Sequence, residues 1–155
     1  KKIDFLFGTV HKKIIKSGFK RNKIYWSFDF YPSHSTGFFI SNNAQKKIGL
    51  YDIKFKLSAD HDFFFRLIKS NFKGMATKEE DLIGYFKKDG GSFSSTLSFY
   101  EQLKEETNIR LKNKQNILSI IFVILLNYSM KFIKNEKRSI SIKECINLIK
   151  ICIQN

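Results

Sequence analysis

The feature that most limits how this chain can fold is an apolar run at residues 117–126 (ILSIIFVILL), in which Ser119 is the one polar residue. A helix that crosses a bilayer needs about 20 apolar residues, whereas runs of about 10 to 14 are typical of buried or interfacial helices. Four basic residues follow the run: Lys131, Lys134, Lys137 and Arg138. This arrangement predicts a helix on an anionic lipid surface, and the alternative is a core helix covered by the rest of the protein.

Composition places the chain among ordinary globular domains, because 43% of its 155 residues are hydrophobic and 15% are aromatic. Cys145 and Cys152 lie in a helical pattern two turns apart, which is about 10 Å and too far for a disulfide. We expect both to be small apolar residues of a protein from a reducing compartment. The sequence has no cluster of His and Cys that is typical of a zinc site.

Charge is strongly positive, with 28 Lys and Arg against 14 Asp and Glu, a formal charge of +14. Residues 1–50 hold ten of these basic residues and only two acids, Asp4 and Asp29. Such a field favours anionic partners, of which nucleic acid, an anionic membrane surface and a nucleotide diphosphate are the main classes.

In the first half of the chain, the pattern predicts a short strand at residues 3–8, followed by loops and short elements over residues 11–31. Residues 34–41 (HSTGFFIS) have the pattern of a buried strand. Asn42 and Asn43 are expected N-caps of a short helix through Lys47 that is closed by Gly49.

Further along, Ser58 is a natural N-cap for a helix of about three turns that ends near Asn71. Residues 81–87 suit a strand, and a loop follows at residues 88–95. Ser98 and Glu101 then form a predicted capping box for a charged helix that runs to about residue 114.

The segment with the most chemical potential is residues 58–66 (SADHDFFFR), where Asp60 and Asp62 flank His61 at a predicted helix start. Unpaired backbone N–H groups and the helix dipole favour ionised acids at such a position, so an ionised Asp there can act as a general base. The structural alternative is that acidic residues are simply common at helix starts and that Asp62 and Arg66 form an ordinary i,i+4 ion pair.

Four short motifs occur in a fixed order: H34-S-T-G-F-F-I-S, K47-I-G-L-Y-D52, S58-A-D-H-D-F-F-F-R66 and G90-G-S-F-S-S95. Their order and spacing resemble the second half of bacterial family 2 glycosyltransferases. That family has a His-x-x-x-Phe-Phe strand, then Gly-Leu-Tyr/Phe-Asp, then Ala-Asp-x-Asp with a later Arg, then a Gly-Gly loop with Ser. The likeness covers roughly residues 30–96.

The resemblance implies an α/β fold, namely the second, acceptor-side half of a GT-A-like mixed sheet with flanking helices, followed by a C-terminal helical tail. Residues 1–97 would form the glycosyltransferase half and residues 98–155 the tail with the apolar and basic membrane-surface segment. Asp60 would be the catalytic base of an inverting transfer. Asp62 and Arg66 would give structural support.

The resemblance also implies substrate-binding roles for His34, Gly90, Gly91 and Ser92. The glycines admit close backbone approach in a mobile loop near the sugars, and the structural alternatives are a plain turn and a capped strand residue. A divalent cation, Mg or Mn, is expected in the complete enzyme. The family's Asp-x-Asp motif belongs upstream and has no counterpart before His34. We therefore expect no principal metal ligands in this chain. Either a longer parent protein supplies the donor-binding half, or this chain is not active by itself.

The expected partners are a nucleotide-sugar donor, a saccharide or lipid-linked acceptor, and an anionic membrane surface. The expected location is the cytoplasm, at the inner membrane face, in synthesis of a cell-surface polysaccharide or glycan. One alternative is a basic nucleic-acid-binding domain that uses the Lys, Arg and aromatic residues of 11–31, but the same composition pervades the chain. Another alternative is a membrane-peripheral scaffold without activity.

Overall fold

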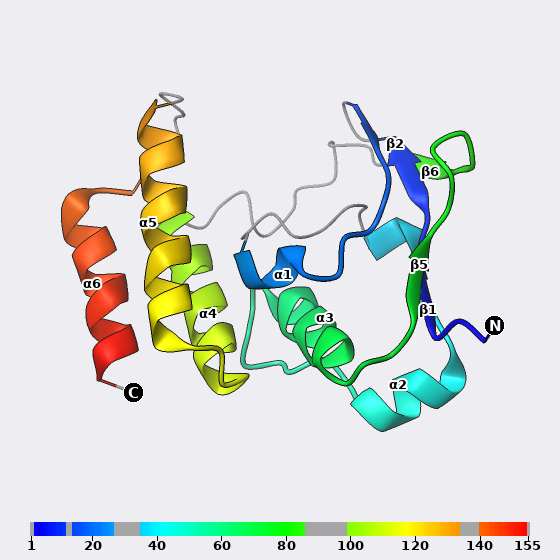
Figure 1. The fold of residues 1–155 in the computed structure, drawn as a ribbon, viewed down its shortest axis with the longest axis horizontal. Helices are drawn as coiled ribbons and strands as arrows, with labels where there is room; N and C mark the ends of the chain where they lie inside the picture. The colour runs from blue at the N-terminus through cyan, green and yellow to red at the C-terminus, as the bar shows by residue number, and fades with distance from the viewer. Residues whose placement is uncertain (1, 12–13, 27–34, 86–98, 134–139, 155) are drawn as a thin grey trace.

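The computed structural model describes residues 2–11, 14–26, 35–85, 99–133 and 140–154, and these residues adopt a mixed α/β fold (Figure 1). Two small sheets lie at one end, and three helices form the other end: α4 (Phe99–Lys112), α5 (Ile117–Ile133) and α6 (Ile142–Ile153). Helices α1 (Lys23–Trp26) and α3 (Ala59–Lys69) lie between the two ends. The α/β class expected from the sequence is confirmed.

The first described sheet has the order β4-β1-β5 and contributes side chains to the hydrophobic core. Its central strand β1 (Phe5–Phe7) is antiparallel to β4 (Phe38–Ile40) and parallel to β5 (Gly74–Ala76). The side chains of Phe5 and Phe7 are buried. Gly74 lies directly beside the ring of Phe5, where an added Cβ would collide with the ring. Close packing of β5 on β1 therefore requires glycine at this position.

The second described sheet has the order β3-β2-β6 and continues from the first. Its strands are β2 (Thr9–His11), β3 (Ile15–Lys16) and β6 (Leu82–Tyr85), and β2 pairs parallel with β6. Only Gly8 separates β1 from β2, so one extended segment contributes the central strand of both sheets.

Aromatic side chains dominate the core between the first sheet and α3. Helix α3 buries three consecutive phenylalanines, Phe63, Phe64 and Phe65, and Phe64 packs against Phe38 of β4 with ring centroids 4.7 Å apart. Consecutive helix residues point in directions about 100° apart, so these rings cover more than one face of α3. Phe64 faces the sheet, whereas Phe65 packs edge-on against Tyr25 of α1 with ring centroids 5.4 Å apart.

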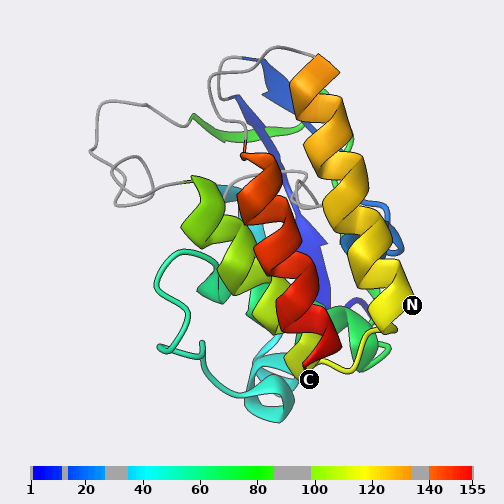
Figure 2. The same ribbon diagram turned by 90° about the vertical axis from the view of Figure 1, so that its left-hand side faces the viewer.

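A second hydrophobic cluster holds α4, α5 and α6 together, and Figure 2 shows α5 and α6 lying side by side. Its centre is formed by Leu103, Ile120, Leu148 and the two cysteines. Cys145 and Cys152 are free thiols and buried, and burial raises the pKa of both, so the expectation of unpaired apolar cysteines is confirmed.

Helix α4 belongs to both clusters, because Leu103 packs in the second and Ile109 in the first. Its fully buried Arg110 donates from Nη1 to the backbone carbonyl of Ile24 at 2.8 Å and to Gln115 Oε1 at 2.9 Å. Burial lowers the pKa of Arg110 to about 10, so the guanidinium stays charged at neutral pH. This buried cation ties α4 to α1.

The local elements around α2 (Asn42–Ile48) differ in detail from the sequence prediction. The buried strand expected at residues 34–41 is limited to Phe38–Ile40, preceded by a 3₁₀ turn at Ser35–Gly37. In the described sheet β4 is an end strand with one pairing partner, and Phe39 is 49% exposed. The N-cap of α2 is Ser41, whose hydroxyl accepts from the N–H of Ala44 at 3.2 Å, rather than Asn42 or Asn43. Closure at Gly49, with φ +82°, is confirmed.

Other expected elements are confirmed: the strands near residues 3–8 and 81–87 and the three-turn helix that follows Ser58. The charged helix expected after residue 98 is α4, and its predicted N-cap, Ser98, lies outside the described residues. Strand β5 was not predicted, because Gly-Met-Ala has little intrinsic preference for a strand and forms one only by pairing with β1.

Helix α5 is apolar on two opposite faces with different surroundings. Ile120, Val123 and Ile124 are buried against the neighbouring helices, as the core-helix alternative requires. The opposite face exposes Leu118 (75%), Phe122 (52%) and Leu125 (46%). No helix in the described part of the chain combines the length and apolar character needed to cross a membrane.

Candidate functional site

The candidate site lies at the N-terminal end of α3, where the expected base Asp60 stands in the first turn. Asp60 is exposed, and its Oδ1 accepts a hydrogen bond from the backbone N–H of His61 at 2.8 Å. A carboxylate at this position benefits from the partial positive charge of the helix start. The site therefore presents a solvent-accessible acid on a rigid element.

The start of α3 is fixed by a residue of α4, which lies nearly fifty positions further along the chain. Glu105 of α4 accepts three backbone N–H bonds, from Lys56 at 3.0 Å, Leu57 at 2.8 Å and Ser58 at 3.0 Å. Ser58 occupies the N-cap position as predicted, but its side chain makes no capping hydrogen bond. Glu105 thus orders the turn that immediately precedes Asp60, and nothing in the local sequence indicates this role.

Asp62 faces inward and is the centre of a buried charge cluster. Its carboxylate accepts from Arg66 Nε at 2.9 Å, Lys112 Nζ at 3.0 Å and Asn113 Nδ2 at 3.2 Å. The predicted i,i+4 pair with Arg66 is confirmed. The side chain of Asp62 is 0% exposed, so the pair belongs to the core rather than to the surface. Lys112 and Asn113 are partners that sequence reasoning missed.

The same cluster holds the loop of residues 49–58. Arg66 donates to the carbonyls of Ile48 at 2.5 Å and Leu50 at 2.8 Å. Lys112 bridges to Asp52 Oδ2 at 2.8 Å, and this hydrogen bond lowers the pKa of the Asp52 carboxyl. Burial alone would lower the pKa of Lys112, but its bonds to the two aspartates raise it. The loop is consequently anchored at several points.

Tyr51, within this loop, stacks on Phe63 of α3 with ring centroids 4.6 Å apart and an interplanar angle of 20°. Tyr51 is 45% exposed as a residue, whereas Phe63 is fully buried beneath it. Partial burial, and secondly the negative charge of Asp60, raise the pKa of Tyr51. The tyrosine hydroxyl is therefore uncharged at neutral pH and lies within electrostatic range of Asp60.

His61, between the two aspartates, is buried, and burial followed by the charge of Arg110 lowers its pKa to about 3. A neutral imidazole inside the core is unsuited to proton exchange with a solvent-borne substrate at neutral pH. The three consecutive residues thus differ: Asp60 is an exposed acid, His61 is a buried neutral base, and Asp62 is a buried acid paired with basic side chains.

All four predicted substrate-binding residues lie outside the described residues, namely His34, Gly90, Gly91 and Ser92. Among the residues that are described, no group of three or more His, Cys, Asp or Glu could hold a metal ion.

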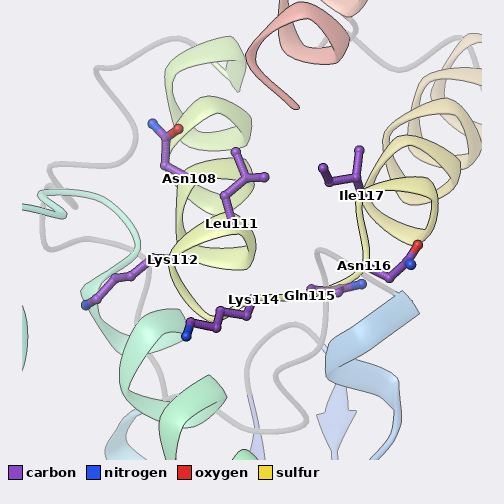
Figure 3. A pocket seen from close by; sticks show the side chains of 7 residues that line it. All are labelled: Asn108, Leu111, Lys112, Lys114, Gln115, Asn116 and Ile117. Carbon is purple, nitrogen blue, oxygen red and sulfur yellow. The ribbon is translucent and has the colours of Figure 1, made fainter. Parts of the chain in front are cut away.

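A cavity of about 660 Å³ opens where α4 ends and α5 begins, and Figure 3 shows the side chains around it. Two of the polar residues that line it make structural hydrogen bonds. Gln115 donates to the carbonyl of Tyr25 at 2.9 Å, and Asn116 caps α5 through the N–H of Ser119 at 3.2 Å. Asp60 does not line this cavity. We therefore keep the start of α3 as the candidate site.

Comparison with known proteins found no match to this chain among protein-family models, curated proteins or solved structures.

Proposed function

We propose that this chain is the acceptor-side half of a GT-A-type glycosyltransferase resembling bacterial family 2, which transfers a sugar from a nucleotide-sugar donor to a saccharide or lipid-linked acceptor. The observation that carries the proposal is Asp60, an exposed carboxylate at the start of an 11-residue helix within the motif that the family uses for its base. Mixed strand directions in the first described sheet and the flanking α3 support the same proposal.

In the proposed reaction, Asp60 removes the proton from an acceptor hydroxyl. That oxygen attacks the anomeric carbon of the donor sugar, and the bond from this carbon to the nucleotide diphosphate breaks in the same in-line step. The proton ends on Asp60, the sugar on the acceptor, and the electron pair on the departing diphosphate. The configuration at the anomeric carbon is inverted.

The surroundings of Asp60 suit this role physically. The helix start favours the ionised form that a base needs, and Glu105 holds the preceding turn in one conformation. Asp62 supports Asp60 indirectly, because its bonds to Arg66 and Lys112 attach α3 to the loop of residues 49–58 and to α4. Fixed geometry matters, since displacement of a reacting group by about 1 Å costs about 10²-fold in rate.

We further propose that the outward face of α5 attaches the protein to an anionic membrane surface on the cytoplasmic side. Leu118, Phe122 and Leu125 form an exposed apolar stripe at i, i+4 and i+7. Trp26 of α1 extends it, since this residue is 53% exposed and its ring packs edge-on against Phe122 with ring centroids 6.4 Å apart. Tryptophan beside aliphatic residues is typical of membrane interfaces.

The test of the catalytic proposal uses the longest natural polypeptide that contains this chain. It would be incubated with a panel of nucleotide sugars, and release of the nucleotide diphosphate would be measured with and without Mg²⁺ or Mn²⁺. Donor hydrolysis or transfer that depends on Asp60 is the expected result. A polypeptide with an Asp-x-Asp half that turns over none of the panel would contradict the proposal.

A further inference from the structure

The loop before α3 exposes an unusual set of apolar side chains. Leu50 is 83% exposed, Ile53 is 90% exposed, and Tyr51 between them is 45% exposed. Single exposed apolar residues are normal, but a contiguous group that leads directly into a candidate site indicates contact with something else.

This exposed group is held rigidly rather than left loose. The carbonyl of Leu50 accepts from Arg66 at 2.8 Å, and the neighbouring Asp52 accepts from Lys112 at 2.8 Å. Both residues that adjoin Tyr51 in the chain are thus fixed by cations from helices. A side chain ordered before binding loses less conformational entropy when a ligand arrives.

Tyr51 is also aligned with the candidate base. Its ring stacks on Phe63, and Phe63 lies three residues after Asp60 on α3, so the two residues occupy the same side of the helix. The guanidinium of Arg66 lies over the Phe63 ring at 5.4 Å and completes the support. The Tyr51 ring therefore rests on the buried Phe63 ring, and Asp60 is close enough for its charge to raise the pKa of the Tyr51 hydroxyl.

An exposed aromatic ring with a fixed orientation suits one ligand class in particular. One face of a pyranose ring carries C–H groups with partial positive charge, and these pack against the negative face of an aromatic ring. Tyrosine supplies such a surface at low entropic cost because it has few rotatable bonds. Hydroxyl groups at the ring edge would then reach Asp60.

We propose that Tyr51 is a saccharide-binding residue on which the acceptor sugar stacks beside Asp60. The inference rests on the proposed function, and it adds the subsite and the ligand class that this subsite takes. The competing explanation is that Tyr51 only covers the buried Phe63 ring, in which case any apolar side chain of similar size would serve.

The experiment compares Tyr51→Phe and Tyr51→Leu in the full 155-residue chain. Phenylalanine keeps an aromatic face, whereas leucine covers Phe63 without one. Binding of soluble methyl glycosides, disaccharides and trisaccharides of glucose, galactose, mannose and N-acetylhexosamines would be measured by saturation-transfer NMR. We expect Tyr51→Phe to retain affinity within about twofold and Tyr51→Leu to bind about three- to tenfold more weakly.

Tyr85→Leu is the matched control, because Tyr85 is 69% exposed on β6 and away from α3, and it should bind as the unaltered chain does. Circular dichroism would verify that each variant is folded, and Tyr51→Met replaces the leucine variant if that variant is unfolded. Absence of binding to every saccharide, or equal binding by the leucine variant, would overturn the inference.

Binding needs no sugar transfer, so the two proposals can fail separately. A chain that binds saccharides through Tyr51 but retains full turnover after Asp60→Asn in the longer polypeptide would keep the subsite and lose the proposed base. Loss of turnover in Asp60→Asn together with unaltered binding in Tyr51→Leu would reject the subsite alone.

Discussion

Lys112 Nζ lies 3.0 Å from Asp62 Oδ1, although fifty positions separate the two residues in the chain. Lys112 is in the last turn of α4, and Asp62 is in the first turn of α3. The same ammonium group bonds to Asp52 at 2.8 Å. One lysine thus fixes both the helix that bears Asp60 and the loop that bears Tyr51.

The buried carboxylate of Asp62 should therefore matter for stability. Asp62→Asn keeps the shape but removes the charge that compensates Arg66 and Lys112, and breaking a buried pair costs about 3–5 kcal/mol. Because Arg66 and Lys112 are partly exposed, with 22% and 41% of their side chains accessible, we expect a loss of about 2–3 kcal/mol. Urea unfolding would measure it, with the more exposed Asp52→Asn as a control that should destabilise the protein less than Asp62→Asn does.

Asp60→Asn should act on turnover rather than on stability. The variant keeps the shape of the exposed side chain and removes the base, so turnover by the longer polypeptide should fall about 10²- to 10⁴-fold. Donor binding should change little, because the base contacts the acceptor. Initial-rate kinetics and donor titration would separate the two effects. Near-normal turnover would reject Asp60 as the base, and Glu80→Gln, an exposed acid in a turn, is the control.

The buried His61 should make the protein sensitive to mild acid. Its folded pKa, about 3, is below the unfolded value of about 6.5, so the unfolded chain takes up a proton first. The contribution of neutral His61 to the free energy of unfolding is fully present above about pH 6.5. It is lost as pH falls, with a slope of up to about 1.4 kcal/mol per pH unit. We expect about 2 kcal/mol less unfolding free energy at pH 5 than at pH 7.5.

Urea unfolding across this pH range, repeated for His61→Gln, would check the effect. The variant should show a flatter pH dependence, whatever its absolute stability. An equal slope in the unaltered chain and in His61→Gln would show that His61 is not the source.

Membrane attachment through α5 should depend on its outward face. Changing Leu118, Phe122 and Leu125 to serine leaves the buried residues in place and removes the apolar stripe. Flotation with vesicles of phosphatidylcholine and phosphatidylglycerol should then recover at least about tenfold less protein, since each apolar side chain contributes on the order of 1 kcal/mol. Vesicles of phosphatidylcholine alone should bind less of the unaltered chain.

The matched control changes Ile142, Ile146 and Ile153, the same number of exposed apolar residues on α6. This variant should float as the unaltered chain does. Loss of flotation in the α6 variant, with retention in the α5 variant, would move the attachment to α6.

Elements with a local cause could be predicted from the sequence. Helix α3 follows from an N-cap position, first-turn acids and an apolar stripe, and the pair of Asp62 with Arg66 follows from the helical period. The separation of Cys145 from Cys152 is fixed in the same way. Such features depend on residues within about one or two turns of each other, so a short window of sequence contains their whole cause.

Features that join distant segments of the chain could be seen only in the folded structure. The pairing of β5 with β1, the capping of α3 by Glu105, the contact of Lys112 with Asp62 and the stacking of Tyr51 on Phe63 have no local signal. Each one requires the chain to close a loop, and many other partners would satisfy the same local preferences. The packed core selects among them, because the native arrangement buries the phenylalanines and at the same time gives Asp62 and Arg110 polar partners.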